Sequence, residues 1–329
     1  MSLVIEPEIV SSVMARSGLS KKGLCDYVIN VATGCLHGCS FCYVPSTPVI
    51  RARSKILQDR GVENPALDWG QYLFYRPDLP KQLENVLRNK RTWDETPAGK
   101  GVVMLSSGTD PFQNSKVANI TKETVEVLLK YNKRVRLLTR SPLAIKMAAQ
   151  YGAIFAHPNV TVGFSIPTLN DALSRAIEPR SPRPSNRLDA AKRLKDAGVR
   201  IYFAAAPIAP VKNVKGDRLD FETIYDLVQA LTALDPEVVF FECINPRGTN
   251  GDRMRNLGLN WVDAISAQPD WHAYWLETWG WANSAFWDLG KIGLFHPWPD
   301  TQLLKLARGA EFANINYWLE RPTVELWPA

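Results

Sequence analysis

Apolar residues along the chain gather in six short runs, which alternate with longer segments of helical periodicity. The apolar runs cover 27–32, 101–106, 134–139, 160–166, 200–207 and 238–244. The helical segments cover 79–89, 121–131, 142–151, 170–177, 185–197 and 220–234. Nearly continuous apolar runs are typical of parallel strands that helices bury on both faces. The pattern therefore predicts an α/β fold with six βα units, fewer than a closed eight-stranded barrel requires.

The alternation ends near residue 250, and the composition of the chain changes there. We expect an N-terminal segment, an α/β domain and a C-terminal aromatic helical extension at 1–26, 27–250 and 251–329. Nine of the eleven tryptophans follow residue 260, and Trp271, Trp275 and Trp279 share one helix face. We expect this face to pack on the α/β domain, although a platform for stacking nucleobases would use the same spacing.

The stretch 45–80 lacks clear periodicity and contains Arg51, Arg53, Lys55 and Arg60. It fits a lid or substrate loop, and it fits equally a helix-and-loop insertion with a solvated basic face.

Three of the five cysteines, Cys35, Cys39 and Cys42, lie in one loop with the spacing CxxxCxxC. An odd count with three thiols in one loop is not a disulfide framework. Three thiolates can hold a [4Fe–4S] cluster and leave one iron open to a ligand. His37 would complete a Cys3His zinc site, and a redox pair or buried structural thiols are further alternatives.

The composition is that of a soluble globular protein, with 46% hydrophobic and 22% charged residues. No apolar run reaches the roughly 18 residues needed to cross a bilayer, and we expect a cytoplasmic protein without a membrane partner. The net charge of +6 and the pI of about 9.0 permit an anionic partner such as a nucleic acid without requiring one.

Polar residues gather where the predicted strands end, which is where parallel α/β barrels carry their chemistry. The segments concerned are 106–112, 139–142, 165–168, 178–182, 206–210 and 242–248.

The cysteine motif, with Phe41 before its last cysteine, resembles the cluster loop of the radical SAM superfamily. The strand ends resemble its spore photoproduct lyase-like branch more narrowly, over residues 30–210. The shared features are a TDP-aromatic-Q turn at 109–113, a TKSP-like turn at 139–142, a serine at 165, an EPR-x-P segment at 178–182 and a PIxP strand end at 207–210. The resemblance implies a partial (β/α)6 TIM-type barrel with the cluster loop after the first strand.

The resemblance also implies the cofactors, a [4Fe–4S] cluster and S-adenosylmethionine, and an external flavodoxin- or ferredoxin-like electron donor. Cys35, Cys39 and Cys42 would be the metal ligands. The cofactor-binding candidates are Ser107, Asp110, Arg140, Ser165, Glu178 and Arg180. Helix or turn capping by Ser107, Ser165 and Asp110, and a structural Glu178–Arg180 pair, are the alternatives. Arg140 stands where the branch usually has lysine.

Repair enzymes of this branch use a further cysteine or tyrosine as hydrogen donor, and Cys25, Tyr43 and Cys243 are the candidates here. Strand alternation places Glu242 and Cys243 on opposite faces. A charged Glu242 is costly against the helix layer, so we expect it to face the barrel mouth and Cys243 to face outward.

The sequence thus favours a radical SAM enzyme in which a 5′-deoxyadenosyl radical abstracts hydrogen from a substrate. Nucleic acid is the first substrate class, through lesion repair or base modification, and a peptide or small metabolite is the second. A zinc-stabilised nucleic-acid-binding protein without catalysis is the alternative of another class.

Overall fold

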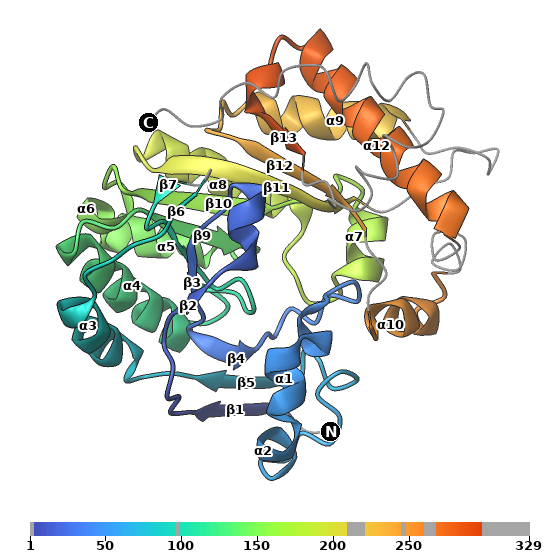
Figure 1. Cartoon of the computed structure of the whole chain (residues 1–329). Helices are drawn as coiled ribbons and strands as arrows, with labels where there is room; N and C mark the ends of the chain where they lie inside the picture. The colour runs from blue at the N-terminus through green and yellow to red at the C-terminus, as the bar shows by residue number, and fades with distance from the viewer. Residues whose placement is uncertain (1–2, 97–98, 209–220, 245–247, 260–267, 298–329) are drawn as a thin grey trace.

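The central element is an eight-stranded sheet, seen in a computed structural model that describes all residues except 1–2, 97–98, 209–220, 245–247, 260–267 and 298–329 (Figure 1). The six predicted strands are confirmed as β3 (Tyr27–Ile29), β8 (Val103–Leu105), β9 (Val135–Thr139), β10 (Val160–Ser165), β11 (Arg200–Ile208) and β12 (Val239–Cys243). They pair in parallel and in chain order. Figure 1 shows the sheet as an open arc, which is the partial barrel that the resemblance implied.

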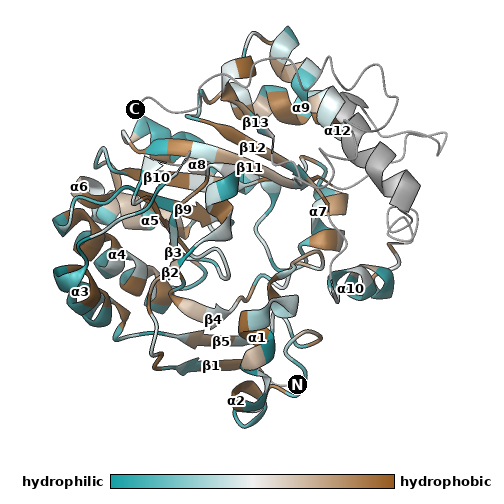
Figure 2. Ribbon diagram, in the orientation of Figure 1, coloured by the Kyte–Doolittle hydropathy of each residue, from teal (hydrophilic) through white to brown (hydrophobic). Residues whose placement is uncertain are grey.

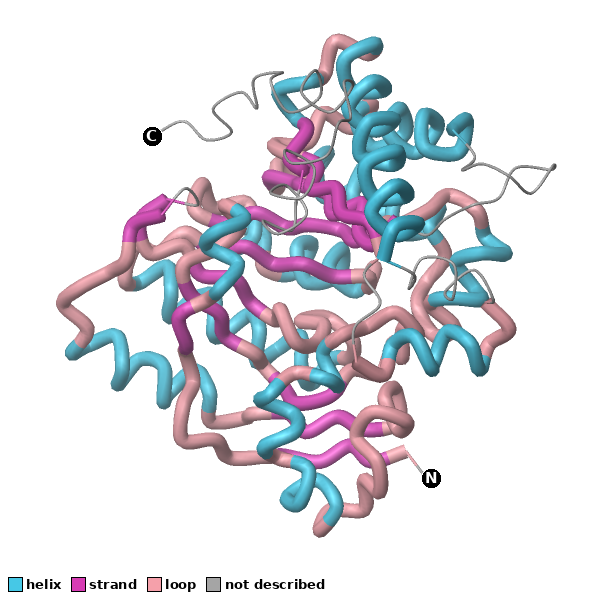
Figure 3. The backbone as a smooth tube through the Cα atoms, turned by 45° about the vertical axis from the view of Figure 1, so that its right-hand side comes forward, coloured by secondary structure: helices cyan, strands magenta, loops and turns pink. Residues whose placement is uncertain are grey.

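Helices cover the outer side of this arc (Figures 1 and 3). They are α3 (Leu79–Asn89), α4 (Ser115–Lys130), α5 (Leu143–Gln150), α6 (Gly152–Phe155), α8 (Pro184–Asp196) and α9 (Phe221–Thr232), with α7 (Asp171–Ile177) at the end of β10. Helix α4 begins before its predicted start because the Asn114 side chain accepts the Val117 N–H. Figure 2 shows hydrophobic residues along the strands and on the helix sides that face them.

A second, three-stranded sheet lies below the arc and is built from β1 (Val4–Pro7), β5 (Tyr72–Tyr75) and β4 (Ala32–Gly34). The sequence analysis predicted neither β1 nor β5, which lie in the N-terminal segment and in the stretch without clear periodicity. The stretch 45–80 is therefore partly a strand, preceded by η2 (Val44–Ser46), α1 (Pro48–Ala52) and α2 (Ser54–Gln58). Buried Glu8 joins the two parts of this unit through Arg53 at 2.5 Å and Arg76 at 2.9 Å.

Four short elements complete the described part of the fold before α4. They are β2 (Ala15–Arg16), antiparallel to β3, the turn η1 (Gly18–Lys22) and the hairpin β6 (Glu95–Thr96) and β7 (Gly99–Lys100).

Beyond residue 248 the described chain forms α10 (Asn250–Asn256), α12 (Gln268–Asp288), η3 (Ile292–Leu294) and β13 (Phe295–Pro297). Strand β13 adds a further parallel strand beside β12, which the sequence did not predict. Helix α12 packs on α9 and β12. Trp279 is buried there, with its ring centroid 6.1 Å from that of Phe295; the side chains of Trp271 and Trp275 lie outside the described residues. No helix of the described ranges combines the length and apolarity needed to cross a membrane.

The two faces of β12 pack against different groups of side chains. Phe240 contacts Tyr202, with ring centroids 5.8 Å apart, in a cluster that also contains Cys25 on the inner side of the arc. Phe241 packs outward, with its ring centroid 6.2 Å from that of Phe295. Strand alternation therefore turns Glu242 toward the inner side and Cys243 toward the helix layer, as predicted.

Candidate functional site

The cysteine loop follows β4 and brings Cys35, Cys39 and Cys42 to the carboxyl end of the sheet. Burial raises the pKa of Cys39 to about 11 and also raises the pKa of Cys35 and Cys42. Negative charge on Asp110, Cys39 and Cys42 raises the pKa of Cys35 further. Among the described residues, no three His, Cys, Asp or Glu side chains form a ready-made metal site. Three adjacent thiolates need a nearby positive charge, which a metal centre would supply.

Each of the three sulfurs receives hydrogen bonds that favour its thiolate form. The donors are the His37 N–H for Cys35, the Val44 N–H and the Trp69 indole for Cys42, and the Ser181 hydroxyl, 3.8 Å from the sulfur, for Cys39. Trp69 and Ser181 were missed by the sequence analysis, because neither belongs to a motif and both reach the loop through packing. Such bonds tune the charge that a sulfur ligand can carry.

The turn after β8 binds the first half of the cysteine loop at successive residues. Thr109 donates its hydroxyl to the Gly34 carbonyl, and the Leu36 N–H donates to Gln113 Oε1 at 2.8 Å. Gln113 Nε2 donates in turn to Thr109 Oγ1 at 2.8 Å. The 109–113 motif is therefore a clamp that holds the loop at the end of the sheet.

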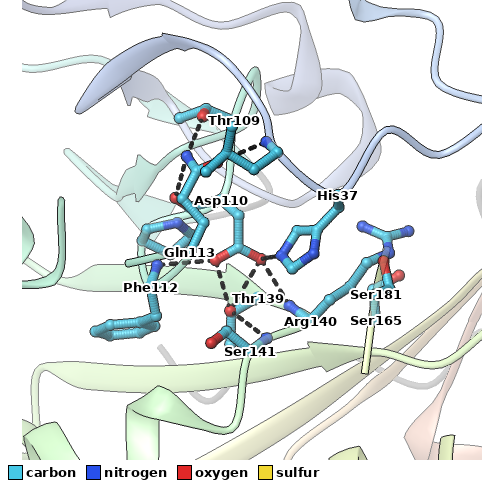
Figure 4. Close-up of polar contacts among 12 residues, drawn as sticks. His37, Thr109, Asp110, Phe112, Gln113, Thr139, Arg140, Ser141, Ser165 and Ser181 are labelled. Carbon is cyan, nitrogen blue, oxygen red and sulfur yellow. Dashed lines mark hydrogen bonds and ion pairs between the residues drawn. The ribbon is translucent and has the colours of Figure 1, made fainter. Parts of the chain in front are cut away.

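Asp110 is the centre of this clamp (Figure 4). Its buried carboxylate accepts the Thr139 hydroxyl and the Arg140 N–H, each at 2.8 Å, and lies 3.1 Å from His37 Nε2. Burial alone would raise the pKa of Asp110, but His37 and the backbone donors hold it below its usual range. Asp110 thus stabilises the turn, which was the alternative to a contact with the cofactor. The contact between Asp110 and His37 does not favour a Cys3His zinc site, because it occupies the His37 Nε2 atom.

Glu178 pairs with two arginines at the end of α7. Its Oε1 is 2.5 Å from Arg140 Nε, and its Oε2 is 2.7 Å from Arg187 Nη2. Burial would raise the pKa of this carboxyl, yet the charges of Arg140 and Arg187 hold it below its usual range. The Glu178–Arg180 pair, which was one of two alternatives for these residues, is not formed, because Arg187 on α8 reaches Glu178 and Arg180 donates to the Gly70 carbonyl. The buried Arg187 was missed, since its spacing in the sequence marks only a helix position.

Arg140 lies beside the cysteine motif. Its guanidinium lies 5.5 Å from the centre of the Phe41 ring, and the charges of Cys39 and Glu178 raise its pKa although burial opposes this. Within the part of the chain that the structure describes, its two terminal nitrogens make no hydrogen bond. Arg140 therefore presents a fixed, planar pair of donors suited to a carboxylate.

Arg180 holds a second loop against the cysteines. It donates to the Gly70 carbonyl, beside Trp69. A Cβ on Gly70 would lie 2.8 Å from the Gly38 Cα, so the two glycine backbones are in direct contact. Gly70 also has a φ of +101°, which favours glycine. This contact seats Trp69 on Cys42.

The remaining sequence candidates take different places. Ser165 is buried and donates to the Ala206 carbonyl at 3.1 Å, so it joins β10 to β11 and caps no helix. Ser107 is half-buried in the clamp turn. Tyr43 directly follows Cys42 and is 49% exposed.

Cys243 lies on the outer side of β12, and Cys25 precedes β3, at the opposite end of that strand from the cysteine loop. Cys243 is buried against α12, where it is hydrogen-bonded to Thr278, and burial raises its pKa. Cys25 sits in the inner apolar cluster beside Phe240, and burial raises its pKa to about 11. Cys243 as a catalytic group is thus at odds with the structure, because its thiol faces the helix layer.

The model of the radical SAM superfamily matches residues 29–208, which is more than half of the chain. Among curated proteins, the chain is 28% identical over 247 residues to an uncharacterized protein of Acidianus two-tailed virus, covering 74% of this chain and 75% of the relative. It is 26% identical over 205 residues to an uncharacterized protein of Methanocaldococcus jannaschii, covering 60% and 68%.

Among solved structures, the chain is similar to a spore photoproduct lyase mutant with bound AdoMet and dinucleoside spore photoproduct. The TM-score is 0.51 at 17% identity, and the match covers 78% of this chain and 66% of the lyase. A second lyase mutant with the dinucleoside alone gives a TM-score of 0.53 at 18% identity, covering 78% and 65%. The chain spans just under two thirds of the lyase's length, and the likeness shows a shared fold.

Proposed function

The chain belongs to the radical SAM superfamily, and on this premise we propose that Cys35, Cys39 and Cys42 hold a [4Fe–4S] cluster whose open iron binds S-adenosylmethionine. The donor set fits that group. The loop offers three thiols, each already receiving a hydrogen bond, while the neighbouring His37 is bound to Asp110. Three protein thiolates leave one iron of a four-iron cluster for another ligand.

When bound, the cluster and S-adenosylmethionine supply the electron transfer and the 5′-deoxyadenosyl radical that characterise this enzyme class. The protein's own part is placement. Arg140 would bind the methionyl carboxylate with its terminal nitrogens, since its Nε is occupied by Glu178. Arg187 binds the other Glu178 oxygen and donates to the Ser165 carbonyl at 2.9 Å. Glu178 is therefore held in place, and it in turn fixes the guanidinium of Arg140.

Further polar contacts would come from Ser107 and Ser165. Ser165 keeps its hydroxyl lone pairs for an N–H or O–H donor, because its proton is given to Ala206. Trp69 and the joined Gly38–Gly70 backbones support the loop on the Cys42 side.

The substrate face is the inner side of β12 and the edge near Tyr43. Glu242 turns to this side by strand alternation and is our candidate for a group that contacts substrate or moves a proton. Tyr43 is the remaining candidate hydrogen donor.

Nucleic acid is the substrate class that we propose. The net charge of +6 supports an anionic partner, and solved lyases of the same fold bind a dinucleoside. The external electron donor that the superfamily needs is proposed to be a flavodoxin- or ferredoxin-like protein.

The observation that carries the proposal is the set of three sulfurs with their individual hydrogen-bond donors. The test is anaerobic reconstitution with iron and sulfide, followed by EPR of the reduced protein with and without S-adenosylmethionine. We expect about four irons per chain, and a signal that changes when S-adenosylmethionine is added. Tight zinc in place of iron would overturn the proposal.

The substrate class is tested separately with the reconstituted enzyme, a reductant and S-adenosylmethionine. Ultraviolet-irradiated DNA should stimulate 5′-deoxyadenosine formation over unirradiated DNA of the same sequence. Stimulation by a peptide or small-metabolite pool, with none by either DNA, would replace nucleic acid with the second substrate class.

A further inference from the structure

Helix α10 and the residues just before it bind the outer side of the cysteine loop, beyond the residues 29–208 that the family model matches. The Thr249 N–H donates to Ser46 Oγ at 3.0 Å, and Asn250 Nδ2 donates to the Phe41 carbonyl at 2.9 Å. A Cβ on Gly248 would lie 2.3 Å from Ser46 Oγ, so the approach is close. Figure 1 shows α10 at the same end of the molecule as α1 and α7.

Arg253 of α10 makes the most contacts to this loop. Its Nε donates to the Ser40 carbonyl and its Nη1 to the Ala66 carbonyl, each at 3.1 Å, and its Nη2 donates to the Cys42 carbonyl. One guanidinium thus joins the cysteine loop to the 63–70 loop that carries Trp69. The carbonyl acceptors belong to the backbone that positions the thiols.

The charge of Arg253 lies against the backbone of the cysteine loop, at the Ser40 and Cys42 carbonyls. Burial lowers its pKa, while negative charge on Cys42 and Cys39 opposes that change. Among the described residues, no carboxylate forms an ion pair with Arg253, whereas Arg140 is paired with Glu178. Arg253 therefore brings an uncompensated, partly buried positive charge to the Cys42 side of the loop, where a charge acts more strongly than in water.

We propose that Arg253 is a positioning residue that raises the reduction potential of the cluster bound by Cys35, Cys39 and Cys42. This inference rests on the proposed function. One electron from a one-electron donor adds one negative charge to the cluster, and no bond or proton changes with it. A nearby cation stabilises the reduced form more than the oxidised form, and charge and hydrogen bonding near the sulfurs are known determinants of the potential.

The test compares four variants with the wild type after anaerobic reconstitution. R253Q removes the charge, and R253K keeps the charge but loses the three-carbonyl fork. N250A loosens the same loop without any change of charge. R255Q removes an equal charge from the exposed side of α10, where Arg255 pairs with Asp252 at 2.7 Å.

The readouts are the midpoint potential from an EPR-monitored titration with redox mediators, the iron content, and the melting temperature of each reconstituted protein. We expect a more negative midpoint potential in R253Q alone. R253K, N250A and R255Q should keep the wild-type potential, even where R253K and N250A retain less iron.

A wild-type potential in iron-loaded R253Q, or an equal negative shift in R253K and N250A, would overturn the inference and leave Arg253 a structural clamp. If R253Q fails to fold, R253M takes its place; R253K and N250A then still decide between charge and clamp. A wild-type protein that takes up no cluster would overturn the proposed function itself.

Discussion

His37 Nε2 and Asp110 Oδ2 lie 3.1 Å apart and link the cysteine loop to the turn after β8, with both side chains buried. The contact joins residues separated by 73 positions in the sequence. It gives the loop a fixed place before any ligand is bound.

Asp110→Asn should reduce iron retention after reconstitution and destabilise the protein by about 2–3 kcal/mol at neutral pH, because the amide replaces an ionised acceptor of several hydrogen bonds. The pKa of Asp110 is lowered in the folded state. The Asp110 carboxylate therefore contributes its full stabilisation at any pH above about 3.9, which is the pKa of aspartate in the unfolded chain. This stabilisation is lost as the pH falls through the lower pKa that Asp110 has in the folded state.

Urea denaturation from pH 7 down to about 3 measures this effect, with the exposed Asp189→Asn on α8 as control. The wild type and the control should lose stability more steeply than Asp110→Asn at the acid end. Parallel acid profiles for all three proteins would contradict the role of Asp110.

Glu178→Gln should cost about 3–5 kcal/mol of unfolding free energy, since it leaves Arg140 and the fully buried Arg187 without their shared anion. Glu84→Gln is the control, because the Glu84–Lys130 pair lies at the surface and should contribute little. Chemical denaturation measures both. Equal losses in the two variants would show that the buried pair is not the support we describe.

Arg140→Lys should weaken S-adenosylmethionine binding by about 10- to 100-fold, because one ammonium cannot serve Glu178 and a carboxylate together. Anaerobic calorimetry on reconstituted protein gives the Kd. Arg193→Gln, an exposed cation on α8, should bind like the wild type. Full affinity in Arg140→Lys would remove Arg140 from the proposed carboxylate site.

Gly70→Ala should destabilise the protein by about 1–3 kcal/mol more than Gly61→Ala. Both glycines have positive φ, +101° and +84°, so both variants carry the same kind of backbone strain. A Cβ meets Gly38 only at residue 70, and nothing lies within 4 Å at residue 61. The difference in urea midpoint between Gly70→Ala and Gly61→Ala therefore measures the effect of the Gly38–Gly70 contact. Equal midpoints for the two variants would argue against that contact.

The sequence predicted the six parallel strands because long apolar runs are sufficient to mark buried strands. It also predicted the outward turn of Cys243, since strand alternation depends on neighbours in the chain. The strands β1, β5 and β13 were not predicted, because they lie in 1–26, 45–80 and 251–329, outside the alternation of apolar runs and helical segments.

Most of the residues that support the cysteine loop could not be predicted from the sequence. Trp69, Ser181, Arg187 and Arg253 reach the site from separate elements, and tertiary packing alone brings them there. Motif spacing identified the three thiols and the 109–113 turn, but it left open what each turn residue binds. Arg180 is an example. Its position near Glu178 in the sequence suggested an ion pair between the two, but Arg180 donates to the Gly70 carbonyl instead.

The most direct test of the central claim is the formation of 5′-deoxyadenosine from S-adenosylmethionine by the anaerobically reconstituted, reduced protein. Cys39→Ala removes one proposed cluster ligand, and Cys243→Ala removes a buried thiol that faces α12. We predict product with the wild type and with Cys243→Ala, and none with Cys39→Ala. Equal product from all three proteins, or none from the wild type when iron is bound, would contradict the account.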